Sequence, residues 1–149
     1  MLELDDGERF TEGPAIVQYL ADRAPQKKLA PAHGSMERYR LQEWLNFITS
    51  ELHKGFGPLF TPTTPEDYKP TVREKLLLRF GFVDGALAKK SYLLGNDFSV
   101  ADAYLFTVAN WSGSVGVGIK HLAKLGEFMH RVRERPSVQA ALEAEGLPK

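Results

Sequence analysis

The spacing of apolar residues in this chain changes from strand-like to helical after the first ten positions. Leu2, Leu4 and Phe10 suit two short strands, and the residues at 5–7 between them (Asp-Asp-Gly) are typical of a tight turn. Beyond Thr11, apolar residues recur every three or four positions, and proline suits the first turn of a helix. The pattern therefore predicts a β-hairpin followed by a helix over about 14–23.

The remainder of the chain is predicted to be helical after one break. Pro, Gly and Lys are mixed without a period over residues 24–35, which is typical of a linker. Apolar residues then recur at helical spacing over 35–56, 72–87, 99–110, 119–132 and 136–145. The stretch 99–110 is apolar on nearly every side, so we expect it at the centre of a helical bundle.

Composition and charge narrow the possible classes of protein. The 149 residues include 19 basic and 19 acidic side chains, so net charge favours neither nucleic acid nor an anionic membrane as a partner. No apolar run approaches the ~20 residues that span a bilayer, and acids stand where a secretory signal would be basic. We therefore expect a cytoplasmic protein. The sequence contains no cysteine, which excludes a thiol nucleophile from these residues.

The start of the first predicted helix is a candidate binding site. A helix start offers free backbone N–H groups and a partial positive charge, which together suit a carboxylate. Gly13 allows a ligand to approach the backbone, and Glu12 beside it could hold an ammonium group. The pair would suit an amino-acid head group. Alternatively, Glu12 only complements the helix dipole.

A second candidate site is the polar face of the predicted helix 35–56. At ~100° per residue, Asn46, Ser50 and His53 lie within about 60° of one another. Lys54 follows directly, and Phe56 could supply an apolar wall. The alternative is an ordinary solvated face. The histidines show no metal-ligand spacing, so no metal is expected.

Ser99 and Asp102 have the spacing of a helix N-cap and its third residue, with Asp in place of the usual Glu or Gln. This pair predicts a capping box, which is a folding signal, and we do not expect catalysis there.

Several segments together resemble a bacterial glutathione transferase, most closely the Beta class. The segments are TEGPAIVQYLAD (11–22), EWLNFITSELHKGFGPLF (43–60), PEDYKPTVREKL (65–76), FSVADAYLF (98–106) and RPSVQAALEAEGL (135–147). The resemblance implies a mainly α fold. Residues 1–25 would be the last two strands and third helix of a thioredoxin-like domain, 26–34 a linker, and 35–149 the C-terminal helical domain.

The resemblance also implies a function. Such enzymes conjugate glutathione to apolar electrophiles or reduce mixed disulfides, with glutathione as co-substrate and no metal. The first part of the thioredoxin-like domain, which carries the thiol-activating residue, has no counterpart here, so we expect this chain to be a truncated form that is inactive alone. The alternatives are a non-catalytic helical binding or assembly module, or a fragment.

The resemblance further implies site residues and a partner. Glu12 and the Gly13 backbone would bind the γ-glutamyl group. Ser99 and Asp102 would form the helix cap that the family uses in folding. His53 and Lys54 would lie near the thiol as auxiliary catalytic residues. Further positions would line the glutathione pocket (Asn46, Ser50, Glu51, Leu52 and His53) and the electrophile pocket (Phe56 and Trp111). The helices at 14–23 and 35–56 match the family's subunit interface, so we expect a homodimer, with domain exchange as one form of it.

Overall fold

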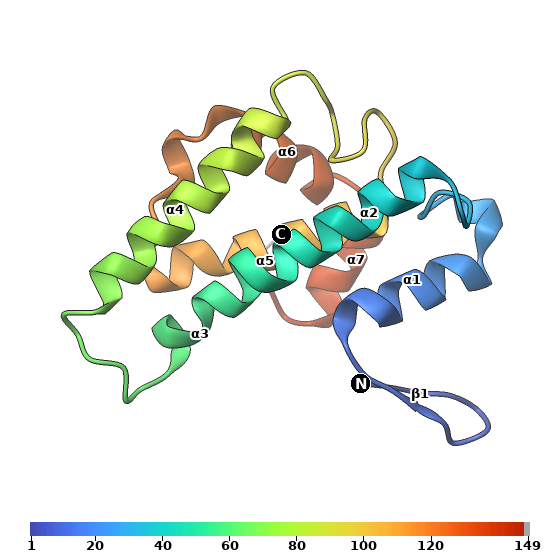
Figure 1. The fold of residues 1–149 in the computed structure, drawn as a ribbon, viewed down its shortest axis with the longest axis horizontal. Helices are drawn as coiled ribbons and strands as arrows, with labels where there is room; N and C mark the ends of the chain where they lie inside the picture. Colours follow the sequence, from blue (N-terminus) through green and yellow to red (C-terminus); the bar gives the residue numbers. More distant parts are fainter. Residues whose placement is uncertain (148–149) are drawn as a thin grey trace.

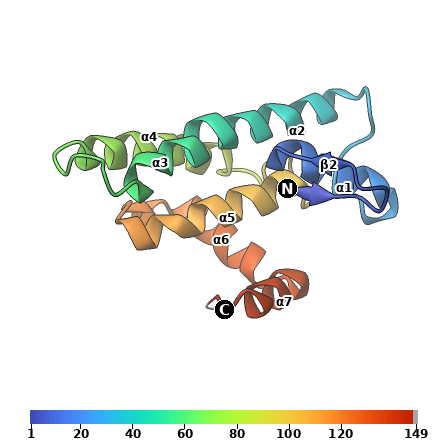
Figure 2. The same cartoon turned by 90° about the horizontal axis from the view of Figure 1, so that it is seen from below.

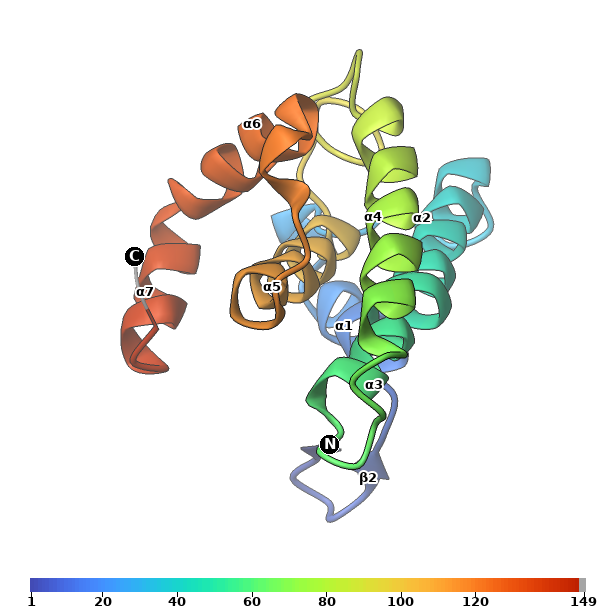
Figure 3. The ribbon, with the colours of Figure 1, turned by 90° about the vertical axis from the view of Figure 1, so that its left-hand side faces the viewer.

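The computed structural model describes residues 1–147, which form a small hairpin and a layered set of helices (Figure 1). The elements are β1 (Leu2–Glu3), β2 (Arg9–Phe10), α1 (Gly13–Arg23), α2 (Met36–Phe47), α3 (Lys54–Phe60), α4 (Lys69–Ala86), α5 (Val100–Val115), α6 (Ala123–Arg133) and α7 (Pro136–Ala144). Figure 2 shows α2, α3 and α4 in one outer layer and α6 and α7 on the other side of α5. The end-on view in Figure 3 shows the same order, with α5 between α4 and α7.

The predicted hairpin is confirmed, although each strand is only two residues long. The strands are antiparallel, with Leu2 opposite Phe10. Gly7 adopts a positive φ of 86° in the turn, a conformation that side chains disfavour. The ring of Phe10 lies 5.6 Å from that of Tyr19, which fixes the hairpin to α1. Such a short pair of strands depends on this contact, since an isolated hairpin is marginal in water.

An ion pair between a buried arginine and a partly exposed aspartate joins α1 to the start of α2. The Arg38 guanidinium, 5% exposed, donates Nη1 to Asp22 Oδ1 at 2.9 Å and Nη2 to Oδ2 at 2.7 Å. It also donates to the Pro31 carbonyl at 3.1 Å, so the linker is held against the same group. This bidentate hydrogen bonding lowers the pKa of Asp22. One arginine thus positions α1, the linker and α2.

The predicted single helix over 35–56 is longer and less regular in the structure. A π-helical segment, Ile48–His53, separates α2 from α3 within one continuous helical run. At its end the Lys54 N–H donates to the Thr49 carbonyl, five residues back instead of the usual four. The expected apolar stripe is confirmed and fully packed in the core (Leu41, Leu45, Ile48 and Leu52).

The close approach of α3 and α4 depends on Gly55. A Cβ atom at this position would lie 2.9 Å from Leu76 Cδ2, below any ordinary carbon contact. Leu76 is itself 1% exposed and packed in the core. Any larger residue at position 55 would therefore push the two helices apart or repack the leucine.

The central place expected for the helical stretch 99–110 is confirmed, because α5 packs against α1, α2, α6 and the π-helical segment. The capping box is also confirmed. The Asp102 carboxylate accepts hydrogen bonds from Ser99 N–H, Ser99 Oγ and Leu93 N–H, each at 2.8 Å. Burial raises the pKa of Asp102, and these three donors oppose the shift. The cap therefore also fastens the preceding loop to α5.

Two helix ends depend on residues distant in the sequence. The α5 helix continues to Val115, beyond the predicted end at residue 110, and Arg73 Nε donates to the Val115 carbonyl at 2.8 Å. The predicted helix over 119–132 is divided into a 3-10 turn at Ile119–His121 and α6. Asp84 of α4 accepts from the Leu125 N–H at 2.8 Å and so caps the start of α6. No helix over residues 1–147 is long and apolar enough to cross a membrane.

Candidate functional site

The residue that precedes α1 has an unusual backbone conformation. Glu12 adopts φ 64° and ψ 107°, a region that non-glycine residues rarely occupy. Such a conformation costs of the order of 1–3 kcal/mol and persists where the surroundings enforce it, often at functional sites. The Glu12 side chain is exposed, and no residue described in the structure forms a hydrogen bond or ion pair with it.

The first turn of α1 offers fewer free donors than the sequence suggests. Ala15 and Ile16 both donate their N–H groups to the Glu12 carbonyl at 3.0 Å, and Pro14 has no N–H. The Gly13 N–H has no acceptor among the described residues. A Cβ atom at Gly13 would meet nothing within 4 Å, so the backbone there is open to a ligand. This helix start thus presents one free N–H beside one free carboxylate.

The predicted polar face on the second helical run is only partly assembled. Asn46, Ser50 and His53 are all exposed, and Ser50 Oγ donates to the Asn46 carbonyl at 3.0 Å. Glu51, however, forms an ion pair with Arg79 Nε at 2.7 Å and so faces α4. These positions span the π-helical segment, where the spacing of 100° per residue does not apply.

Two predicted pocket residues belong to the core. Leu52 is 0% exposed, so it could offer a ligand only its backbone. Phe56 is also 0% exposed, and its ring lies 5.6 Å from the ring of Trp111. Phe56 therefore supports Trp111 from behind and does not form a pocket wall itself.

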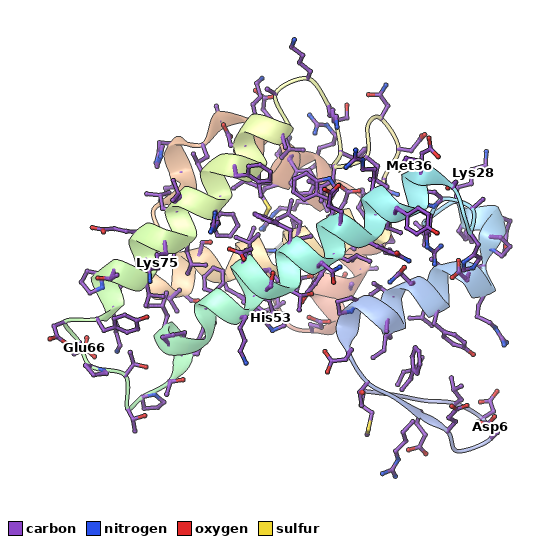
Figure 4. All side chains as sticks on the ribbon, viewed as in Figure 1. Asp6, Lys28, Met36, His53, Glu66 and Lys75 are labelled. Carbon is purple, nitrogen blue, oxygen red and sulfur yellow. The ribbon has the colours of Figure 1, made fainter. Side chains whose placement is uncertain are left out.

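His53 is the centre of a small cluster between the helical run and α5. Figure 4 shows His53 where α2 passes into α3, away from the hairpin turn that Asp6 marks. His53 Nδ1 lies 2.7 Å from the Tyr104 hydroxyl, and the His53 ring meets the Trp111 ring edge-on at 4.8 Å. Neither periodicity nor motif spacing identifies Tyr104 as a partner of His53. The available signal is the Tyr104 hydroxyl on a helix that the sequence places at the centre of the bundle, because a half-buried tyrosine hydroxyl usually has a partner.

Two cavities adjoin this cluster. The first, about 740 Å³, lies between α3 and the loop before α4, and its lining includes His53, Lys54, Thr61 and Tyr68. The second, about 640 Å³, lies between α5, α6 and α7, and Trp111 lines it together with apolar residues. His53 thus lines the first cavity together with Lys54 and contacts Trp111, which lines the second. Neither cavity is lined by Glu12 or Gly13, which stay separate at the start of α1.

No group of three or more His, Asp or Glu side chains in the described part of the chain could hold a metal ion. The His53 cluster offers a hydrogen-bonding imidazole and a neighbouring lysine cation beside an aromatic surface. These groups suit an anionic ligand atom near an apolar molecule.

Comparison with known proteins gives consistent matches. The family model of the glutathione S-transferase C-terminal domain matches residues 47–136. The chain is 51% identical to glutathione S-transferase GstA of Escherichia coli O157:H7 over 98% of this chain and 73% of the relative. It is 35% identical to glutathione S-transferase GST-4.5 of Xanthomonas campestris pv. campestris over 93% of this chain and 71% of the relative.

Solved structures agree with these relatives. A ternary complex of BphK, a bacterial glutathione transferase, superposes with a TM-score of 0.95 at 55% identity, covering 98% of this chain and 73% of that one. A sphingomonad glutathione S-transferase complexed with glutathione superposes with a TM-score of 0.93 at 44% identity, covering 99% of this chain and 73% of that one.

Proposed function

Since this chain belongs to the glutathione S-transferase family, we propose that it binds glutathione through the start of α1. The proposed activity is conjugation of glutathione to apolar electrophiles or reduction of mixed disulfides. The observation that carries the proposal is the backbone of Glu12, which is held in a rare conformation next to an open glycine. The sphingomonad relative, whose structure contains glutathione, supports the choice of ligand.

The α1 site fits the γ-glutamyl end of glutathione by charge. The Glu12 carboxylate would hold the ammonium group, and the Gly13 N–H would donate to the carboxylate, aided by the positive end of the helix dipole. Asn46 and Ser50 would add polar contacts from the helical run, in part across a subunit interface. In this assignment Glu51 and Leu52 contribute backbone only, given their positions against Arg79 and in the core.

The His53 cluster would act on the sulfur end of glutathione. A thiolate is the reactive form of a thiol, and nearby cations stabilise it. His53 and Lys54 are the auxiliary residues proposed for this role, and Trp111 would line the electrophile pocket. Because the chain contains no cysteine, the reacting thiolate would be that of glutathione itself. That a further thiol-activating residue is required stays a prediction.

A calorimetric titration of glutathione into the 149-residue chain tests the α1 site. Glu12→Ala is expected to weaken binding roughly tenfold, since it removes one charged contact worth about 1.4 kcal/mol. Glu8→Ala is the matched control, because it removes an exposed acid from the neighbouring hairpin. Equal affinity in all three proteins would show that Glu12 holds no part of the ligand. No binding to any of them would favour a non-catalytic binding or assembly module.

We also propose a homodimer. The interface implied by the resemblance lies on α1 and on the helical run that starts with α2, and an exposed aromatic patch on α2 and α4 supports the α2 part of it. The patch consists of Trp44, Phe47, Leu78 and Phe82, of which Leu78 is 70% and Phe82 59% exposed. Exposed apolar clusters of this kind mark interaction surfaces. Phe82→Glu is expected to raise the dimer dissociation constant more than tenfold in analytical ultracentrifugation, whereas Phe60→Glu, at an exposed phenylalanine outside the patch, is not. Unchanged association of Phe82→Glu would refute this interface.

The domain assignment follows from the same family membership. We propose that residues 1–25 correspond to the end of a thioredoxin-like domain, 26–34 to the linker, and 35–149 to the C-terminal helical domain. The BphK and sphingomonad structures superpose over 98% and 99% of this chain, so the matched region includes the hairpin and α1 as well as the later helices. The cytoplasmic location stays a prediction from the sequence.

A further inference from the structure

The contact between His53 and Tyr104 determines which ring nitrogen carries the imidazole proton. His53 Nδ1 and the Tyr104 hydroxyl oxygen are 2.7 Å apart, which is a short hydrogen bond. In a neutral imidazole one nitrogen is a donor and the other an acceptor, so the hydroxyl either donates to Nδ1 or accepts from it. If the hydroxyl donates to Nδ1, then Nε2 carries the proton and is a donor. If the hydroxyl accepts from Nδ1, then Nε2 is an acceptor.

The surroundings of Tyr104 favour donation from the hydroxyl to Nδ1. Among residues 1–147, the other polar atom near the hydroxyl is Thr49 Oγ1, at 3.4 Å, which is too long for a strong O–H···O bond. Thr49 Oγ1 already donates to the Leu45 carbonyl at 2.8 Å. The hydroxyl proton of Tyr104 therefore has one good acceptor, and that acceptor is an unprotonated Nδ1. A neutral imidazole nitrogen is also a much stronger base than a phenol oxygen.

The ring of His53 is held on a second side as well. Trp111 meets it edge-on, with an interplanar angle of 82° and a centroid distance of 4.8 Å. Trp111 in turn packs against the buried Phe56. The hydroxyl and the indole together leave the imidazole few alternative orientations, although His53 itself is exposed to the cavity that it lines.

We propose that Tyr104 is a positioning residue that holds His53 in the Nε2–H tautomer. The nitrogen on the far side of the ring from Tyr104 is then a hydrogen-bond donor. His53 would therefore stabilise an anionic sulfur by donating to it and would not act as the base that removes the thiol proton. This consequence rests on the proposed function, whereas the tautomer itself does not.

The tautomer can be measured without glutathione. Long-range ¹H–¹⁵N correlation spectra at about pH 8.5, where ordinary imidazoles are neutral, distinguish protonated from unprotonated ring nitrogens. The chain contains four histidines, and His53→Gln assigns the signals of His53 by their loss. We expect a protonated Nε2 and an unprotonated Nδ1 in the unaltered chain. A protonated Nδ1 would overturn the proposal.

Tyr104→Phe and Tyr39→Phe form a matched pair for the role of the hydroxyl. Tyr39 is 57% exposed on α2, so its replacement removes a hydroxyl that does not contact His53. We expect Tyr104→Phe to move the His53 nitrogens toward the shifts of a tautomer mixture, with Tyr39→Phe unchanged. Identical His53 spectra in the unaltered chain and Tyr104→Phe would also overturn the proposal.

Glutathione affinity separates this inference from the proposed function. If half of the His53 rings adopt the other tautomer, the binding-competent fraction falls and the apparent affinity falls about twofold. Tyr104→Phe is therefore expected to weaken glutathione binding about twofold or more. If no protein binds glutathione but the Nε2–H tautomer is observed, the inference about Tyr104 stands and the proposed function fails.

Discussion

Replacement of Asp102 by alanine should be among the most destabilising single changes in this chain. The carboxylate is 0% exposed and accepts three hydrogen bonds, two of them from the buried backbone N–H groups of Leu93 and Ser99. Alanine would leave both N–H groups without an acceptor, and the third donor, Ser99 Oγ, would also lose its partner. The start of α5 would thus lose its hydrogen bond to the loop before it.

The expected magnitude follows from these bonds. Each buried donor that loses its acceptor costs about 1–3 kcal/mol, so the two backbone groups alone would give about 2–6 kcal/mol. Burial raises the pKa of Asp102, which shows that dehydration of the carboxylate offsets part of this gain. We therefore expect a net loss of about 3 kcal/mol in the free energy of unfolding.

Urea unfolding followed by circular dichroism measures this loss. With a slope of roughly 2 kcal/mol per molar urea, a loss of 3 kcal/mol lowers the midpoint by about 1.5 M. Ser99→Ala is the matched control, since it removes the side-chain half of the cap and should cost only about 1 kcal/mol. If Asp102→Ala cost no more than Ser99→Ala, the bond from Leu93 to the carboxylate would contribute nothing to stability, contrary to this prediction.

Three further predictions concern α1, α2 and α3. In urea unfolding, Gly55→Ala should lower the free energy of unfolding by about 1–3 kcal/mol through overpacking. Gly57→Ala, where a Cβ meets nothing within 4 Å, should leave this free energy unchanged or raise it. Equal effects of the two changes would contradict the close approach of α3 and α4. Asp22→Asn should cost roughly 2–3 kcal/mol at neutral pH, since it leaves the buried Arg38 guanidinium without its carboxylate. Because Arg38 lowers the pKa of Asp22, the difference in unfolding free energy between the two proteins should be present at pH values above the ordinary carboxyl pKa and disappear as the pH falls below about 4 in urea titrations. A difference that persisted at low pH would contradict the ion pair. Gly13→Ser should tighten glutathione binding about fivefold in calorimetry, because its hydroxyl adds a hydrogen bond worth about 1 kcal/mol in an open position. Unchanged binding would mean that the ligand does not approach this backbone.

The sequence alone determined the number and type of most elements. Short-range periodicity and turn chemistry predict the hairpin, the helix after it and the central position of the helix that contains residues 100–115. The cap at Ser99 and Asp102 was also predictable, because both partners lie within one helical turn. Features of this kind can be predicted from the sequence, because the residues that interact are neighbours along the chain.

The candidate site was less accessible to sequence reasoning. The periodicity of the run after the linker predicts one regular helix, and the stripe from Leu41 to Leu52 is buried whether or not a π-helical segment interrupts it. The π-helical turn contains more residues than an α-helical turn, so it changes the direction of the side chains in it and after it. A projection at 100° per residue does not include this change. Glu51, inside this segment, faces Arg79, and Phe56, beyond it, lies behind Trp111.

Tertiary structure alone decided the contacts that join distant segments. Asp84 caps a helix 41 residues further along the chain, Arg73 closes the end of α5, and Tyr104 meets His53 across 51 residues. Each of these bonds requires the packing of two helices to place a donor within about 3 Å of an acceptor. The sequence contains the groups, but the spacing of one helix from another is set by the core as a whole, where Gly55 against Leu76 fixes how closely two of them approach.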